Sequence, residues 1–371
     1  MHRALISGPK IPEASVYLRP ISEPPKSIVT NGKVAFGTFS SVPAKLDIRG
    51  VKAPFGGIPL PSILTNIRIK SRIAYMFSIG DYIGMAEFFD DKMFGLAEII
   101  FWNKTTGKKL AYHTFMTPRR RFVPVRLDNA VCVSFNKARY IRVMWSRKHD
   151  RISLSFSLRA GGGRPAVKGS FSAHFSDPLH KELLVVTPAP TMRRCSATWL
   201  TTMPIHGSLN ILAGRKTQGI PMQDADGLAF MALNRTYYKY HVKSEMMCGL
   251  GEYEGKKLLF RFVTTSMDPH EADYSNENVV VIDDQVTPMP SVCMTHPFGI
   301  NHKWVIQDTE TMVDLTFTPV SVNHRTLNIL VMRTDYNNIY GTFDGMLLTG
   351  SGEKITLKNF PGIVKKNLLR I

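Results

Sequence analysis

Short stretches of alternating apolar and polar residues recur along most of the chain. In the clearest one, residues 152–158, four large apolar residues alternate with three serines. Successive side chains of a β-strand point to opposite faces, so this pattern predicts a strand with one buried and one solvated face. Comparable stretches recur at regular spacing after residue 67, separated by turn residues. Such a meander of short strands is typical of a β-barrel or β-sandwich.

The same pattern gives the extent of the expected strands. Residues 228–247 fit either a strand pair or one helix, and the tyrosines near position 238 favour strands. No long helix is evident, so we expect an all-β fold. The expected strands are 34–39, 73–79, 83–89, 94–102, 109–115, 130–135, 140–145, 152–158, 167–175, 183–187, 198–203, 208–212, 258–264, 279–282, 303–306, 313–317, 327–332 and 355–357.

Domain organisation is read from where the β pattern begins and where it is interrupted. Residues 1–65 are rich in Pro, Gly and Ser, which predicts an extended, irregular arm packed on the body or on a partner. Strand patterns fill the rest of the chain, and a turn-rich stretch near residues 176–196 marks a boundary. We therefore expect one β-domain over residues 66–180 and a second over residues 181–371.

Charge is unevenly distributed along the 371 residues, whose formal net charge is +18 at pH 7. Residues 104–168 hold sixteen Lys and Arg against two acids. A field of that kind favours nucleic acid, anionic lipid or an acidic protein partner. The alternative is a set of solvated strand faces and turns. The candidate polyanion contacts are Arg119, Arg120, Arg121, Arg139, Arg142, Arg147 and Lys148.

Cysteine spacing and hydropathy bear on the compartment. The four cysteines lie far apart without a Cys-x-x-Cys pair. This argues against a zinc ribbon or a disulfide framework and favours an intracellular, reducing compartment such as the cytoplasm or an organelle interior. Residues 1–20 lack an apolar segment of signal-peptide length. No apolar run approaches the roughly 20 residues of a transmembrane helix.

One segment, residues 262–302, contrasts with the basic chain. It carries six acids and no Lys or Arg. Within it, Asn276-Glu277-Asn278 precedes an apolar run over 279–282 and an Asp-Asp-Gln turn, which reads as a polar loop, a buried strand and a tight turn. Polar groups converging at one strand end can line the mouth of a ligand cavity. The alternative is a solvated loop that offsets the basic surface.

Several landmarks occur in an order that resembles a known family. They are residues 183–189, 195–200, Pro204, 207–211, 275–284 and the ending Gly341…Gly345…Gly352…Pro361-Gly362. The chain resembles domain-of-unknown-function family 2804 over roughly residues 65–371. That family looks related to the lipocalin-like proteins that include carotenoid hydratases and tocopherol cyclases. The resemblance implies two lipocalin-like (calycin) antiparallel barrel halves with an apolar cavity, and no settled activity.

The chain departs from the family pattern over residues 232–246. Members carry an Asp followed by a Gly-Arg-Gly-like turn, a Pro-Tyr pair and two or more tryptophans. Arg235 and Tyr240 match this pattern, whereas the acid and the tryptophans have no counterpart here. If the family's Asp supplies a proton, this chain has lost that group.

Glu277 is the best candidate for chemistry. A carboxylate beside apolar walls can hold a proton and act as an acid, and carbocation chemistry on an isoprenoid needs such an acid together with aromatic walls. Asn276 and Asn278 flank it, and Arg235 is a candidate ion-pair partner. Tyr237, Tyr238 and Tyr240 are candidate wall residues. The alternative is a hydrogen-bonded turn that braces two strands.

Other kinds of chemistry find little support in the sequence. His270, Glu271 and Asp273 lie close together, but no second histidine is spaced to complete a metal site. Gly161-Gly162-Gly163 lacks the Lys-Ser/Thr pair of a phosphate loop. No Gly-x-Ser-x-Gly elbow is present. We therefore expect no metal and no cofactor.

Three functions remain open from the sequence. The first is a binding protein for an apolar small molecule such as an isoprenoid or lipid. The second is a cofactor-independent hydratase, cyclase or isomerase that uses the same cavity. The third is a non-catalytic subunit of a large assembly, one that contains RNA or an acidic protein partner contacted through residues 104–168. We favour the first, because folds that form a cavity usually keep it, although a fold does not by itself determine a function.

Overall fold

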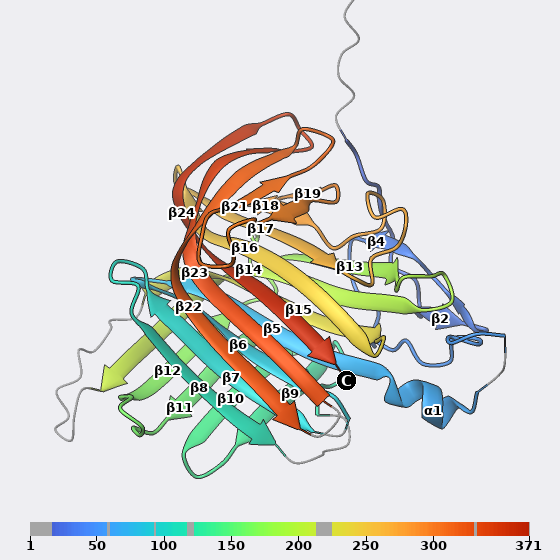
Figure 1. Ribbon diagram of the computed structural model, residues 1–371, viewed down its shortest axis with the longest axis horizontal. Helices are drawn as coiled ribbons and strands as arrows, with labels where there is room; N and C mark the ends of the chain where they lie inside the picture. Colours follow the sequence, from blue (N-terminus) through green and yellow to red (C-terminus); the bar gives the residue numbers. More distant parts are fainter. Residues whose placement is uncertain are drawn as a thin grey trace, which may run out of the picture.

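Two curved antiparallel sheets pack against each other in the computed structural model, and an N-terminal arm runs along one edge (Figure 1). The structure describes residues 17–57, 60–92, 94–116, 122–212, 225–329 and 332–370. Arg119, Arg120 and Arg121, three of the candidate polyanion contacts, lie outside the described residues.

The first sheet curls into a nearly closed barrel. Its strand order is β8-β7-β6-β5-β15-β14-β12-β11-β10-β9, with β13, β4 and β1 attached beside β14. Its main strands are β5 (Ile69–Ile79), β6 (Tyr82–Asp90), β7 (Gly95–Asn103), β8 (Lys109–Met116), β9 (Asn129–Phe135), β10 (Arg139–Ser146), β11 (Arg151–Leu158), β12 (Ala166–Ala173), β13 (Lys181–Pro188), β14 (Cys195–Leu212) and β15 (Ala225–Tyr237).

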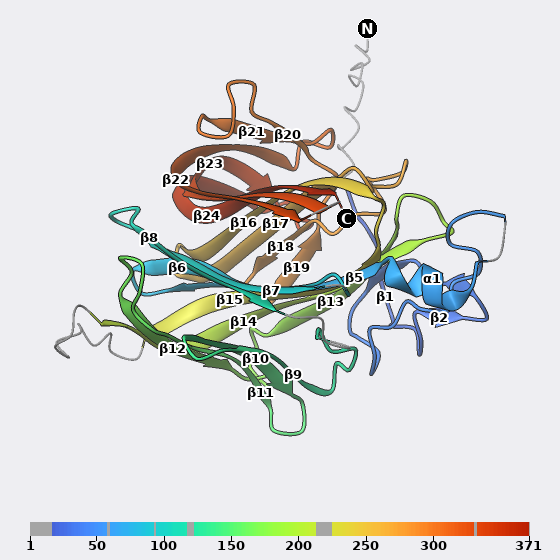
Figure 2. The same cartoon turned by 60° about the horizontal axis from the view of Figure 1, so that its bottom comes forward.

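The second sheet forms a half-barrel, seen above the first in Figure 2. Its order is β19-β18-β17-β16-β24-β23-β22-β21-β20. The strands are β16 (His241–Tyr253), β17 (Lys256–Thr265), β18 (Val279–Ile282), β19 (Gln285–Pro288), β20 (Cys293–Thr295), β21 (Trp304–Gln307), β22 (Val313–Ile329), β23 (Met332–Leu348) and β24 (Lys354–Arg370).

Glycines of the family-like ending allow the long strands of the half-barrel to bend. Gly345 has φ +124°, and a Cβ there would lie 2.2 Å from the Asp314 carbonyl oxygen. The pairing register of β23 and β24 shifts between Phe343 and Gly345. A bulge of this kind bends a strand and increases its twist. The spacing of these glycines therefore reflects the curvature of the second sheet.

The arm contributes four short strands and the helix among the described residues. They are β1 (Ile21–Ser22), β2 (Val29–Thr30), β3 (Lys33–Val34), β4 (Gly37–Phe39) and α1 (Ser62–Ile67). Strand β4 pairs with β13 of the first sheet, and β1 pairs with β4 in parallel. The expected packing of the arm on the body is therefore visible in its hydrogen bonds.

Side chains of the central strands are buried on both faces. In β15, Met231 and Leu233 belong to the core inside the barrel, whereas Phe230 and Ala232 belong to the core between the two sheets. The period of two along the strand sorts alternate residues into these two cores. Hydrophobic packing between the sheets thus buries apolar area on both.

Aromatic side chains fill the inside of the first barrel. Trp145 and Trp199 are fully buried with ring centroids 5.6 Å apart, and Phe77 lies 4.8 Å from Phe171. Interdigitated rings of this size give a core of crystal-like density. The space that a lipocalin-like barrel can use for a ligand is occupied here by the protein's own side chains.

Buried ion pairs also join the two sheets. Glu87 of β6 is paired with Arg72 of β5 and with Lys365 of β24, whose side chain is fully buried. Burial by itself raises the pKa of Glu87, but the charges of Arg72 and Lys365 outweigh it and lower the pKa to about 2. Beside them, Glu98 of β7 is paired with Arg325 of β22 at 2.8 Å.

The expected all-β fold of two barrel-like halves is confirmed. Residues 228–247 form parts of two strands, β15 and β16, as the tyrosines favoured. Strands β13, β14 and β15, the last of which ends at Tyr237, pair within the first sheet, whereas the strands from β16 onward, which begins at His241, pair within the second. That transition lies later in the chain than the domain boundary expected near residue 180, which remains a prediction about folding units.

Replacement of Glu87 by Gln should destabilise the protein strongly. The change leaves Arg72 and Lys365 buried without their shared carboxylate, and breaking a buried pair typically costs about 3–5 kcal/mol. Glu353→Gln is the control, because the Glu353–Lys256 pair at 2.9 Å is exposed and should contribute less than about 1 kcal/mol. Urea unfolding measures both; equal losses would show that the buried network does not hold the sheets together.

Candidate functional site

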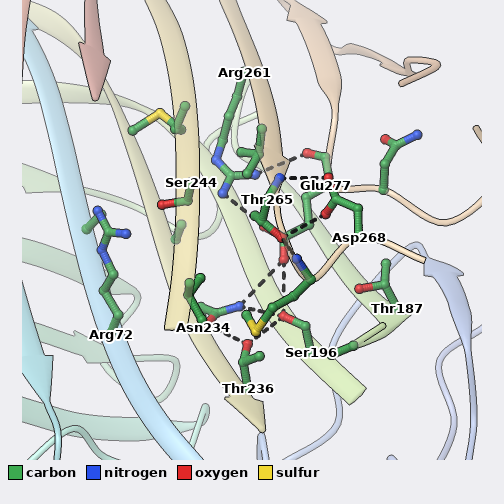
Figure 3. A pocket seen from close by; sticks show the side chains of 18 of the residues that line it. Arg72, Thr187, Ser196, Asn234, Thr236, Ser244, Arg261, Thr265, Asp268 and Glu277 are labelled. Atoms are coloured by element: carbon green, nitrogen blue, oxygen red, sulfur yellow. Dashed lines mark hydrogen bonds and ion pairs between the residues drawn. The ribbon is translucent and has the colours of Figure 1, made fainter. Parts of the chain in front are cut away.

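A cavity of about 110 Å³ lies between the two sheets and contains the side chain of Glu277 (Figure 3). Strands β5, β14 and β15 of the first sheet form one side, and β16, β17 and β24 of the second form the other. The expected polar convergence around Glu277 is therefore present, but it lies between the barrels rather than at a barrel mouth.

The Glu277 carboxylate is held by partners from both sheets. Arg261 of β17 donates to Oε2 at 2.9 Å and to the backbone carbonyl of Glu277 at 3.1 Å. Thr198 of β14 donates to Oε1 at 2.5 Å. Asn234 of β15 donates to Thr198 Oγ1 at 2.7 Å and to Ser196 Oγ at 2.9 Å. Such a network fixes the orientation of the carboxylate.

The two asparagines place Glu277 by bracing the loop that carries it. Asn276 donates to the carbonyl oxygens of Ala272 and Asp273 and lines the cavity. Asn278 is fully buried; it accepts from the Val263 N–H and donates to the Pro290 carbonyl. Asn278 therefore holds the loop in place through these hydrogen bonds, and of the two asparagines only Asn276 lines the cavity.

Arg19 of the N-terminal arm fastens the same loop. Its guanidinium donates to the carbonyl oxygens of Asn276 and Asn278, both at 2.9 Å, and the residue is only 7% exposed. Burial lowers the pKa of Arg19 to about 10, which still leaves it charged at neutral pH. The arm is thus part of the structure that positions Glu277.

Three expected site residues lie away from the cavity. Arg235 and Tyr237 point into the first barrel, where they donate to the carbonyls of Val123 and Ile48. Tyr240 is 49% exposed and accepts a hydrogen bond from Arg370. The structure pairs Glu277 with Arg261 instead of Arg235, and the lining tyrosine is Tyr238, because alternate residues of β15 face opposite sides.

Asp268 is a cavity residue to which the sequence assigned no role. Desolvation raises the pKa of its carboxyl to about 6; hydrogen bonds from Thr265 act in the opposite direction, and the charge of Glu277 adds to the rise. The residue as a whole remains exposed, at the edge of the cavity, so water screens part of these effects. Two carboxylates, those of Asp268 and Glu277, thus line the cavity.

Asn367 of β24 also lines the cavity and has an unsatisfied acceptor. It is 5% exposed, and its Oδ1 has no hydrogen-bond partner. A buried acceptor without a donor costs free energy, so such a group in a cavity favours a ligand that brings an O–H or N–H. The sequence carried no signal for it, since Asn367 lies far along the chain from Glu277.

The described basic candidates do not share one role. Arg139 donates to the His113 carbonyl, and Arg164 donates to the Ala111 carbonyl; both carbonyls belong to β8, the strand at one end of the sheet. Arg147 is paired with Glu182 at 2.7 Å, and Arg142 contacts Met144. Lys148 is exposed in the turn between β10 and β11. A polyanion surface through residues 104–168 remains a prediction.

A larger groove of about 560 Å³ lies on the concave side of the second sheet. Two of its charged side chains already bind each other: Lys366 is 2.8 Å from Glu245, and His296 beside the groove is 3.0 Å from the same carboxylate. Asn367 lines both spaces, but it lies on the same face of β24 as Lys365, which is buried between the sheets. The inter-sheet cavity is therefore the better candidate for a ligand site.

The described residues offer no sign of a metal site or of a membrane-spanning helix. No three His, Cys, Asp or Glu side chains among them are grouped so as to hold a metal ion. Within the same ranges, none of the helical structure has the length and apolarity needed to cross a membrane. The cysteines at 132, 195, 248 and 293 are free.

The pKa of Asp268 should depend on Glu277. Carboxyl-carbon NMR should place the Asp268 midpoint above the 3.8 of an ordinary Asp, and Glu277→Gln should lower it because a nearby negative charge is removed. Glu353→Gln, a remote carboxylate change, serves as the control and should leave it unchanged. A wild-type midpoint at or below 3.8, or one that Glu277→Gln does not move, would contradict this coupling.

Comparison with known proteins adds the family. No curated protein sequence matches the chain significantly. The solved structure of kievitone hydratase from Nectria haematococca is similar over 80% of this chain and 88% of that one, with a TM-score of 0.45 and 9% sequence identity. The family described as "Domain of unknown function (DUF2804)" matches residues 23–370, a longer stretch than the landmarks indicated, and the chain belongs to this family.

Proposed function

We propose that the protein binds a small molecule with an apolar body and a hydroxyl-bearing end in the cavity between its two sheets. The unsatisfied Asn367 acceptor in a partly apolar cavity carries this proposal. Met76, Phe230 and Met246 provide apolar walls from both sheets, while Asn276 and Glu277 provide polar groups at the other side. A few polar groups among apolar walls are typical of small-molecule sites.

The size of the cavity limits what enters it. An apolar cavity of about 150 Å³ takes one benzene ring, so the 110 Å³ here admits a short segment of a ligand. An isoprenoid or lipid alcohol fits this requirement if its hydroxyl end enters and its tail leaves through the open side. Such a ligand meets both the apolar walls and the Asn367 acceptor.

A second candidate function, proton-transfer catalysis, is favoured by the two carboxylates in one cavity. In this scheme Asp268 gives a proton to an alkene carbon, water adds to the resulting carbocation, and Glu277 takes the proton that the water releases. The raised pKa of Asp268 suits a donor, and the hydrogen-bonded Glu277 suits an acceptor. This reaction class is a hydration or, in reverse, a dehydration.

The compartment and the other partners are expectations that accompany this proposal. Four free cysteines are consistent with an intracellular, reducing environment. A structural role in an RNA-containing assembly depends on the basic residues of 104–168, and the described ones among them partly serve internal contacts.

Removal of the Asn367 acceptor should separate ligands by their hydroxyl group. Asn367→Leu should weaken binding of an isoprenoid alcohol by about tenfold, since one buried hydrogen bond is lost, while binding of the matching hydrocarbon stays the same or improves. Titration calorimetry with both probes measures this. Asn337→Leu is the control, because Asn337 lines the neighbouring groove and not the cavity; equal weakening in both variants would place the ligand elsewhere.

Hydration activity, if present, should require both carboxylates. With an isoprenoid alkene as substrate, Asp268→Asn and Glu277→Gln should each lower the turnover at least about 100-fold, as expected for loss of a general acid or base. Retained binding of the alcohol product in both variants would show that the cavity is intact. Unchanged turnover in Glu277→Gln would remove it from the mechanism.

A further inference from the structure

Helix α1 turns its apolar side chains toward solvent. Ile63 is 77% exposed, Leu64 54% and Ile67 45%, and the preceding Leu60 is 48% exposed. The residue that α1 buries is Thr65. A surface helix of a soluble domain normally does the opposite and buries its apolar side. We refer to Leu60, Ile63, Leu64 and Ile67 as the α1 patch; exposed apolar residues gathered in this way mark an interaction site.

Cations gather at the end of the α1 patch that Arg68 forms. Arg68 ends the helix and donates to the Tyr238 carbonyl at 3.1 Å, with Lys239 next in the chain. Arg194, in the turn between β13 and β14, lies within electrostatic range of Arg68. Arg193 in that turn is exposed, and so is the apolar Met192. We refer to Arg68, Lys239, Arg193 and Arg194 as the basic rim of the patch, which lies at its Arg68 end.

Negative charge near the rim is shielded from solvent. The Asp91 carboxylate acts electrostatically on Arg68, but Asp91 is 2% exposed and paired with Lys70. The rim therefore presents cations to an approaching surface. Apolar side chains that insert and cations that contact headgroups are the two features of a peripheral membrane site.

The patch also adjoins the ligand cavity. Tyr238, which binds Arg68 through its backbone, lines that cavity, as does Ala189, where the turn containing Met192 begins. Figure 2 shows α1 at one edge of the molecule, beside the N-terminal end of β5. Strand β5 supplies further residues of the cavity lining. A lipid surface at α1 would therefore lie beside one end of the cavity.

We propose that the α1 patch docks on an anionic lipid surface and that the ligand of the cavity enters from that surface. A second copy of the chain fits this patch less well, because a two-fold contact would bring the same cations of both rims together. The part of the proposal that concerns ligand entry rests on the proposed function, whereas docking itself does not.

Vesicle flotation tests the docking with the full chain. Wild-type protein should float with phosphatidylcholine vesicles that contain phosphatidylserine, and less with phosphatidylcholine alone or at high salt. The double variant Ile63→Asp/Leu64→Asp should bind at least about tenfold more weakly, because two apolar contacts are lost and two negative charges face the lipid. Arg193→Glu/Lys239→Glu should lose mainly the preference for phosphatidylserine.

Phe298→Asp is the matched control, because Phe298 is 78% exposed, like Ile63, but lies in the β20–β21 loop of the second sheet. It should keep wild-type vesicle binding, and thermal unfolding should show all variants folded. No flotation of the wild type, or equal loss in Phe298→Asp, would overturn the proposal. A dimer in ultracentrifugation that Ile63→Asp/Leu64→Asp dissociates would show instead that a second copy covers the patch.

Ligand binding measured without vesicles separates the two proposals. If Ile63→Asp/Leu64→Asp binds an isoprenoid alcohol in solution as the wild type does but takes it up more slowly from vesicles, entry through the patch is supported. Normal docking without any ligand binding would overturn the proposed function and leave the docking surface standing.

Discussion

Contact between the outer faces of two curved sheets is the interaction on which the rest of this structure depends. Strands β14, β15, β16 and β17 are buried on both sides, so neither sheet presents a complete polar exterior. Apolar side chains supply most of this contact, and Glu87 between Arg72 and Lys365 adds a charged centre to it. Paired charges buried in such a place tolerate little displacement, which fixes how the sheets sit together.

The cavity is a consequence of the same contact. Toward one edge, polar side chains join the apolar ones between the two sheets, and space is left open around Glu277. The carboxylate is held from the first sheet by Thr198, from the second by Arg261, and its loop is fastened by Arg19 of the arm. Three separate parts of the chain therefore build one site, and it can form only after the sheets have met.

This arrangement changes where a ligand is expected in a barrel protein of this type. The inside of the first barrel is closed by its own aromatic core, with Trp145 against Trp199. The cavity between the barrels is small but chemically mixed, since apolar walls face two carboxylates and the unsatisfied Asn367. That combination supports either selective binding or proton transfer, and both depend on the same side chains.

The all-β fold and the family could be predicted from the residue pattern alone, and the same pattern singled out Glu277 as a candidate site residue. Alternation sufficed for strands such as 152–158, because one face is buried and the other carries serines. Where both faces are buried, as in β15, apolar residues are continuous and the pattern no longer tells which face is which. Arg235, Tyr237 and Tyr238 were all candidates for the cavity, and the register places Tyr238 there, with Asn234, while Arg235 and Tyr237 point the other way. Only the tertiary structure assigns Asp268, Asn367 and Arg19 to the site. Their contacts with the cavity, or with the loop that carries Glu277, come from segments far apart in the sequence. The packing of the two sheets and the arm brings these segments together.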